Sequence, residues 1–296
     1  MPTSTAPARV AAAALGGVLL AGCHSTPPNP TLTPAANPPA PQPDSPTPGT
    51  VDTTPQPTAR QRLHTLADSI STLRTDQPND LPYTYLHTQT WARATTTITR
   101  TDLRRWRHHT NGSGHDITRR TPDLPHLHHQ PTPAEHTQLT QARPTTTRHP
   151  AGTLRPYLPE PLPTDPNTLT ALLAPPELAG EAAYPRLVAT GIAALATNQY
   201  LHHQDRATTL RVLATIPGIT YRGDSTDPAG RTGHTFQVTA DDSTTTLLIN
   251  PTTGELLAAH EHLTGPRPGL FSYVLILHRE HTATVTPATP DQTRVR

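Results

Sequence analysis

The chain has 296 residues with 23 basic and 22 acidic side chains. Its net charge of +1 excludes a strong positive field, which would attract nucleic acid or an anionic membrane surface. Every basic residue is arginine, and the lack of lysine excludes a Walker-type phosphate site and Schiff-base chemistry. The 37 prolines, 18 histidines and 4% aromatic residues suit GC-rich codon usage, so a single His or Arg is weak evidence of function.

The first residues predict a secretory leader. Arg9 precedes an apolar run over residues 10–20, which is too short to span a bilayer. Leu19-Leu20-Ala21-Gly22-Cys23 resembles the lipobox of bacterial lipoproteins, in which the cysteine is acylated and becomes the new N-terminus. The resemblance implies that residues 1–22 are a lipoprotein signal peptide and that Cys23 carries diacylglycerol and palmitate. Two or more acyl chains suffice for stable anchoring, so we expect the protein on the extracellular face of the cell membrane. The alternative is that Cys23 is an ordinary buried thiol.

Residues 23–58 predict a disordered tether that starts at the lipidated cysteine. Twelve of residues 24–58 are proline and eight are threonine, with almost no apolar side chains to bury. Proline-rich chains extend by about 3.1 Å per residue, so such a tether reaches roughly 100 Å. A low-complexity tail without function has the same composition and remains an alternative.

Residues 59–296 predict one folded domain. Leucine and isoleucine at helical spacing predict a first helix over residues 59–75. Threonine-rich and aromatic segments then predict strands, with Asn111-Gly112 as a hairpin turn. Residues 121–163 are rich in proline and histidine without any period, and predict a long loop. The threonine-rich and aromatic segments before this loop are expected to form three strands, at residues 83–93, 95–106 and 115–120.

A helical insert and a set of strands follow. Asp165 and Pro166 predict a capped helix start, and two more helices are expected near residues 182–201 and 205–215. Short turns separate the last strands, which must therefore form an antiparallel meander. Both faces of the last strand are apolar, so we expect helices on one face of the sheet and a lipid-sized cavity or an inserted loop on the other. The five strands are expected at residues 219–223, 235–240, 244–250, 255–264 and 271–285.

Turn and cap motifs across residues 83–285 resemble a family of lipoproteins from GC-rich Gram-positive bacteria and, more distantly, the lipoprotein-carrier superfamily that includes LolA, LolB and RseB. The resemblance implies an α+β fold with a curved antiparallel sheet, unclosed and half-barrel-like, and helices packed on its concave face. It also implies a non-enzymatic role, either binding a lipid or acyl chain or sensing envelope state for a membrane regulator of the anti-sigma type. No cofactor is implied. The motifs are Trp106 with Asn111-Gly112-Ser113-Gly114, Leu162-Pro163-Thr164-Asp165-Pro166, Ile216-Pro217-Gly218-Ile219, Asp227 with Gly230-Arg231-Thr232-Gly233, and Asn250-Pro251-Thr252-Thr253-Gly254-Glu255-Leu256.

An apolar groove is the candidate ligand site, although the same residues could equally form the core. Its candidate lining is Trp91, Trp106, Phe236, Tyr273 and Leu275.

Metal binding is an alternative function. His260 and His262 are two residues apart and so share one face of a strand, and imidazole suits zinc. Other histidines crowd residues 108–136, but no helical His-Glu-x-x-His motif occurs. A protein-interaction module without any ligand is a further alternative. An enzyme is not expected, because the chain has no Gly-x-Ser-x-Gly elbow, no phosphate-binding glycine loop and no thiol beyond Cys23.

Overall fold

The computed structural model describes residues 56–73, 81–125 and 130–285, all within the second of two compact units, Thr54–Arg296. The predicted signal peptide, Cys23 and the tether as far as residue 55 lie outside the described residues, as do residues 126–129 of the histidine-rich stretch. Within the described ranges, no helix is both long and apolar enough to cross a membrane.

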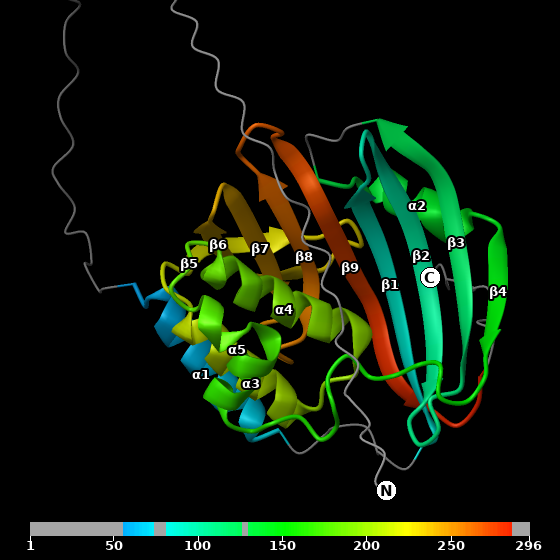
Figure 1. Ribbon diagram of the computed structural model, residues 1–296, viewed down its shortest axis with the longest axis horizontal. Coiled ribbons are helices and arrows are strands. Elements are labelled where there is room, and N and C mark those ends of the chain that lie inside the picture. The colour runs from blue at the N-terminus through cyan, green and yellow to red at the C-terminus, as the bar shows by residue number, and fades with distance from the viewer. Residues whose placement is uncertain (1–55, 74–80, 126–129, 286–296) are drawn as a thin grey trace, which may run out of the picture. The chain divides into compact units, whose positions relative to one another are not determined.

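Nine strands form one antiparallel sheet with two free edges (Figure 1). The strands are β1 (Tyr83–Arg93), β2 (Thr97–His108), β3 (Gly114–Pro125), β4 (Pro144–His149), β5 (Thr220–Thr226), β6 (Thr232–Ala240), β7 (Ser243–Ile249), β8 (Leu256–Leu263) and β9 (Gly269–Thr282). Their order is β4-β3-β2-β1-β9-β8-β7-β6-β5. Two meanders, β1 to β4 and β5 to β9, therefore join where the first strand pairs with the last. The predicted α+β class with a curved, unclosed antiparallel sheet is confirmed.

The Asn111-Gly112 turn between β2 and β3 also holds the segment that runs from β4 to the next helix, residues 150–165, which we call the strap. Gly112 has a φ of +63°, and a Cβ there would lie 2.7 Å from the carbonyl oxygen of Leu154. The Gly112 carbonyl accepts a hydrogen bond from the Leu154 amide at 2.8 Å, and the Asn111 carbonyl accepts one from Gly152 at 2.7 Å. Glycine is thus required both for the left-handed backbone and for the close approach of the strap.

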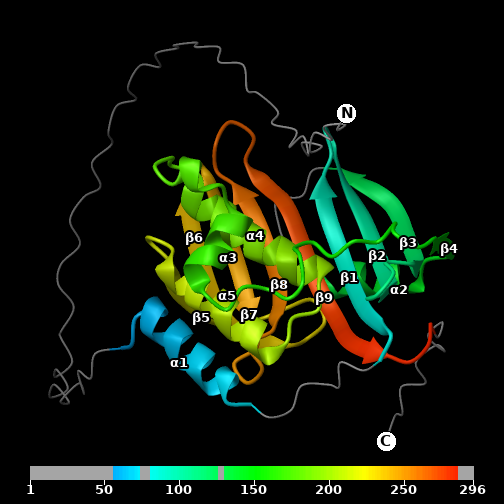
Figure 2. The same ribbon diagram turned by 60° about the horizontal axis from the view of Figure 1, so that its bottom comes forward.

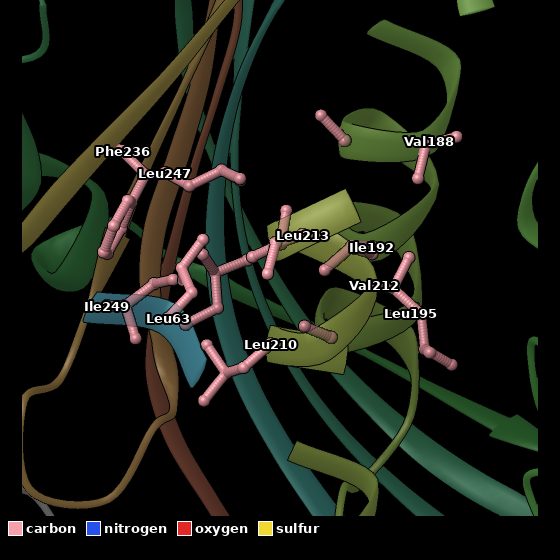
Figure 3. Close-up of a cluster of buried hydrophobic side chains, with 14 of the residues drawn as sticks. Leu63, Val188, Ile192, Leu195, Leu210, Val212, Leu213, Phe236, Leu247 and Ile249 are labelled. Carbon is pink, nitrogen blue, oxygen red and sulfur yellow. The ribbon is translucent and has the colours of Figure 1, made fainter. Parts of the chain in front are cut away.

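Four helices and a short 3-10 turn lie on one side of the sheet, over its β5 to β9 part (Figures 1 and 2). They are α1 (Ala59–Ser71), α3 (Pro166–Leu173), η1 (Pro176–Leu178), α4 (Tyr184–Asn198) and α5 (His203–Thr215). The Asp165 carboxylate accepts a hydrogen bond from the Thr168 amide, which confirms the predicted N-cap of α3. Leu63, Ile192 and Leu213 from three helices meet Phe236 and Leu247 of the sheet in the helix-side core (Figure 3).

The opposite face of the sheet is covered in part by α2 (Pro133–Gln141), which Figure 1 shows behind the strands. The prediction of a long loop over residues 121–163 is therefore wrong: β3 extends to Pro125, and α2 and β4 follow. Neither element has the apolar period that reveals an amphipathic helix or strand. Leu139 is the one buried residue of α2, and β4 is an exposed edge strand. The inserted segment nevertheless supplies the expected cover for the second face.

Candidate functional site

The five residues predicted to line a groove are buried in three separate clusters. Trp91, Tyr273 and Leu275 meet on the α2 side of the sheet, where the Trp91 and Tyr273 rings pack edge to face with centroids 5.7 Å apart. Trp106 stacks on Tyr85 in another cluster, and Phe236 belongs to the helix-side core. None of the five is more than 3% exposed. The structure therefore does not bring these residues together in one groove. Phe236 packs on the face of the sheet opposite to Trp91, whereas Trp106 lies on the same face as Trp91 but towards the other end of β1, where it pairs with Tyr85.

The predicted histidine pair lies on the α2 side. The His260 ring stacks on Tyr273 with centroids 5.5 Å apart, and the His260 and His262 ring centroids are 6.1 Å apart. Burial lowers the pKa of His260 to about 4, with a smaller contribution from His262. Among the described residues, no three His, Cys, Asp or Glu side chains are grouped so that they could hold a metal ion. His260 is therefore a packed imidazole that is neutral near pH 7.

The helix-side core has little empty space. Between α4, α5 and the strands beneath them a gap of about 20 Å³ remains, lined in part by Ile192, Leu210 and Leu213. Such a gap holds about one water molecule. An acyl chain has no room there.

A different pocket, with a volume of about 490 Å³, opens near the ends of β1, β2 and β9. We call it the polar pocket. Its volume falls within the range of small-molecule sites in proteins, roughly 300–1,000 Å³. It is lined by Thr84, Arg107, His109, Thr110, Glu160, Pro161, Leu162, Gln199, Tyr200, His202, Asp205 and His281. Four separate parts of the chain contribute: the ends of the central strands, the turn after β2, the strap, and the junction between α4 and α5.

One side of the polar pocket is a charged cluster. Arg107 of β2 donates from Nη2 to Oε1 of Glu160 in the strap at 2.8 Å. Gln199, which follows α4, donates from Nε2 to the same oxygen at 3.2 Å. Its own Oε1 accepts a hydrogen bond from the Leu158 amide at 3.0 Å, which fixes the orientation of the side-chain amide. Arg107 and Gln199 are therefore both joined to the strap through Oε1 of Glu160.

Another side of the polar pocket is a cluster of rings. The Tyr200 and His281 centroids are 4.3 Å apart, and the His202 ring stacks nearly parallel to His281 at 5.5 Å. The His109 ring lies 6.3 Å from His281. His202 is the N-cap of α5, where its backbone amide donates to the Asp205 carboxylate at 3.0 Å. The rings thus come from the start of α5, from the last strand and from the turn after β2.

The sequence singled out His109 as part of a histidine-rich hairpin and missed the rest of the polar pocket. Arg107, Glu160, Gln199 and His281 are separated by tens of residues and share no spacing pattern. The available signal was weak: Tyr200 lies at the end of a predicted helix and His202 directly follows it, where a loop can present polar side chains.

Comparisons with known proteins identify no family. The chain matches no protein-family profile, and no curated protein matches it. Among solved structures, it is similar to the MucB chain in the crystal structure of MucB in complex with MucA(peri), at 13% sequence identity and a TM-score of 0.29. The matched region covers 80% of this chain and 60% of the MucB chain.

Proposed function

We propose that this protein is a lipid-anchored, non-enzymatic lipoprotein of the extracellular membrane face, whose domain senses envelope state by binding a polar ligand in the polar pocket. The 490 Å³ pocket carries this proposal, because its charges and rings converge on a space suited to a small molecule or a peptide end. Acyl-chain carriage has less support, since the predicted groove residues are buried and the gap in the helix-side core is about 20 Å³.

The anchoring part of the proposal rests on Leu19-Leu20-Ala21-Gly22-Cys23. A membrane regulator of the anti-sigma type would receive the signal, as the resemblance of the turn motifs to the carrier superfamily implies. The non-enzymatic part rests on the sequence, which contains no Gly-x-Ser-x-Gly elbow and no phosphate-binding glycine loop.

Membrane fractionation tests the anchor. We expect the wild-type chain in the membrane fraction with a mass increased by acylation, and the Cys23→Ser chain without the added mass and released from the membrane. Retention of an unacylated wild-type chain would contradict the proposal.

Native mass spectrometry of the full chain, purified in detergent, tests the pocket. Thr110→Trp places a bulky ring at the exposed rim of the polar pocket, and Thr72→Trp adds the same ring at the exposed end of α1. We expect a polar compound from cell extract to bind the wild type and Thr72→Trp but not Thr110→Trp. Binding that survives Thr110→Trp would place the site elsewhere, and a co-purifying lipid would return the groove to consideration.

A further inference from the structure

The polar pocket contains a buried cation whose counter-ion comes from a loop. The Arg107 side chain is 7% exposed, whereas its partner Glu160 is 41% exposed. A buried guanidinium without an anion destabilises the folded protein, so Arg107 requires an acidic group beside it. The strap that supplies Glu160 contains no helix or strand over residues 150–165.

A second arginine on the same strand provides the contrast. Arg105 makes two hydrogen bonds to Asp116, from Nε at 2.9 Å and from Nη2 at 2.7 Å. Both residues lie in paired strands, and the Asp116 side chain is 8% exposed. The Arg105 pair is therefore built into the sheet. The Arg107 pair uses one guanidinium nitrogen and a partially exposed acid, so it can exchange without opening the sheet.

Two fixed donors converge on the exchangeable carboxylate. Arg107 and Gln199 both donate to Glu160 Oε1, and both donor residues are buried. The carbonyl oxygen of Gln199 is already used by the Leu158 amide, so its NH2 group must point toward the carboxylate. A charged donor beside a neutral one, both held in place, is a recognition site for a carboxylate group.

We propose that the ligand of the polar pocket carries a carboxylate that displaces Glu160 from Arg107 and Gln199. Without ligand, the Glu160 carboxylate occupies the position that the ligand carboxylate takes. This inference rests on the proposed function and adds the chemical class of the ligand. Displacement frees Glu160 and removes one contact of the strap, whose hydrogen bonds to Gln199 and to the Asn111-Gly112 turn remain. Ligand binding is thereby linked to a change in the strap.

Calorimetry on the full chain in detergent tests the displacement. The probes are succinate, as a free small acid, and N-acetyl-trialanine with either a free carboxylate or an amide at its C-terminus. Glu160→Gln removes the competing charge and preserves the side-chain shape, and Glu177→Gln is the control, since Glu177 is exposed and does not line the pocket. We expect Glu160→Gln to bind an acid probe about tenfold more tightly than the wild type, because a neutral amide competes less strongly than a carboxylate for the Arg107 guanidinium. Glu177→Gln should match the wild type.

Arg107→Gln completes the test. We expect it to abolish acid binding in both the wild-type and Glu160→Gln backgrounds. If that variant does not fold, Gln199→Met removes the second donor and should weaken acid binding. A tighter complex with succinate identifies a free acid as the ligand source, and a tighter complex with the peptide acid identifies a peptide terminus.

Two results would overturn the inference. One is equal affinity of Glu160→Gln and the wild type for the acid probes, and the other is equal affinity for the acid and amide peptides. If an extract compound still binds in a manner that Thr110→Trp abolishes, the proposed function survives while the carboxylate inference fails. If neither the extract compound nor any acid probe binds, both fail.

Discussion

The two faces of the nine-stranded sheet are covered in different ways. On the helix side, apolar residues of α1, α4 and α5 pack against Phe236, Leu247 and their neighbours in one large cluster. On the α2 side, two smaller aromatic clusters lie near a network of buried polar and charged groups around Asp102. The helix side therefore depends on close packing, which is tolerant of sequence detail, whereas the α2 side depends on specific hydrogen bonds.

The network on the α2 side is centred on a carboxylate with no exposed surface. Asp102 accepts hydrogen bonds from His87 at 2.8 Å and from Gln89 at 2.9 Å, and Arg119 lies 3.4 Å away. Burial by itself raises the pKa of Asp102, but the bonds from His87 and Gln89 lower it below its ordinary value. Gln89 in turn accepts a hydrogen bond from His136 of α2 at 2.8 Å. The helix is thus held by one buried apolar residue, by this polar chain and by a hydrogen bond from Arg100 to Gln138.

The largest effect is expected from the helix-side core. Phe236→Ala removes a ring with no exposed surface that packs beside Tyr221, and we expect unfolding free energy to fall by about 4 kcal/mol in urea titration. Thr239→Ala on the same strand is exposed and serves as the control. Equal losses for the two variants would contradict a close-packed core.

Next in size is the loss of the buried carboxylate. Asp102→Asn removes the negative charge that His87, Gln89 and Arg119 face. We expect the free energy of unfolding, measured by urea titration, to fall by about 3 kcal/mol. Asp224→Asn is the matched control, because Asp224 pairs with His234 but is 55% exposed. That variant should lose less than about 1 kcal/mol. If the two losses are alike, the polar network does not distinguish the α2 side.

Acid should weaken the α2 side. The folded-state pKa of His260 is about 4, below its ordinary 6.5, so between these values the unfolded chain binds more protons. The stability contributed by neutral His260 is complete above pH 6.5 and is lost as pH falls toward 4. We expect the free energy of unfolding, measured in urea, to fall by about 2 kcal/mol between pH 7 and about pH 5. Burial also lowers the pKa of His136, which adds to the effect in the same direction.

A substitution at His260 checks the assignment. His260→Gln should reduce the difference in stability between the two pH values, and His64→Gln, at an exposed position of α1, should leave it unchanged. An undiminished pH dependence in His260→Gln would assign the effect to other groups.

The smallest effect on global stability is expected from α2. Leu139→Ala removes its one buried side chain, so we expect the helix to open locally while global stability falls by about 1 kcal/mol. Hydrogen exchange should show faster exchange in residues 133–141 and unchanged exchange in α4. Faster exchange throughout the sheet would mean that α2 and the helix side unfold as one unit.

Much of the fold was predictable because its elements carry local signals. Helix α1 was found because Leu63, Leu66 and Ile70 repeat at helical spacing, and it begins at the predicted residue, after the Thr58 cap. Strand β1 has the predicted bounds. The meander of β5 to β9 followed from turns too short for any other connection. Helix α2 and strand β4 were missed because neither buries a periodic apolar face.

Outside residues 121–163, the sequence by itself determined which segments become strands and helices, and also that both faces of the last strand would be buried, since spacing, caps and turns are properties of adjacent residues. Only the tertiary structure decided that Trp91 and Phe236 lie on opposite faces and that Arg107, Glu160, Gln199 and His281 meet in one pocket. The reason is physical. Pairing of β1 with β9 and the path of the strap bring together residues far apart in the chain, and such long-range placement leaves no period in the sequence.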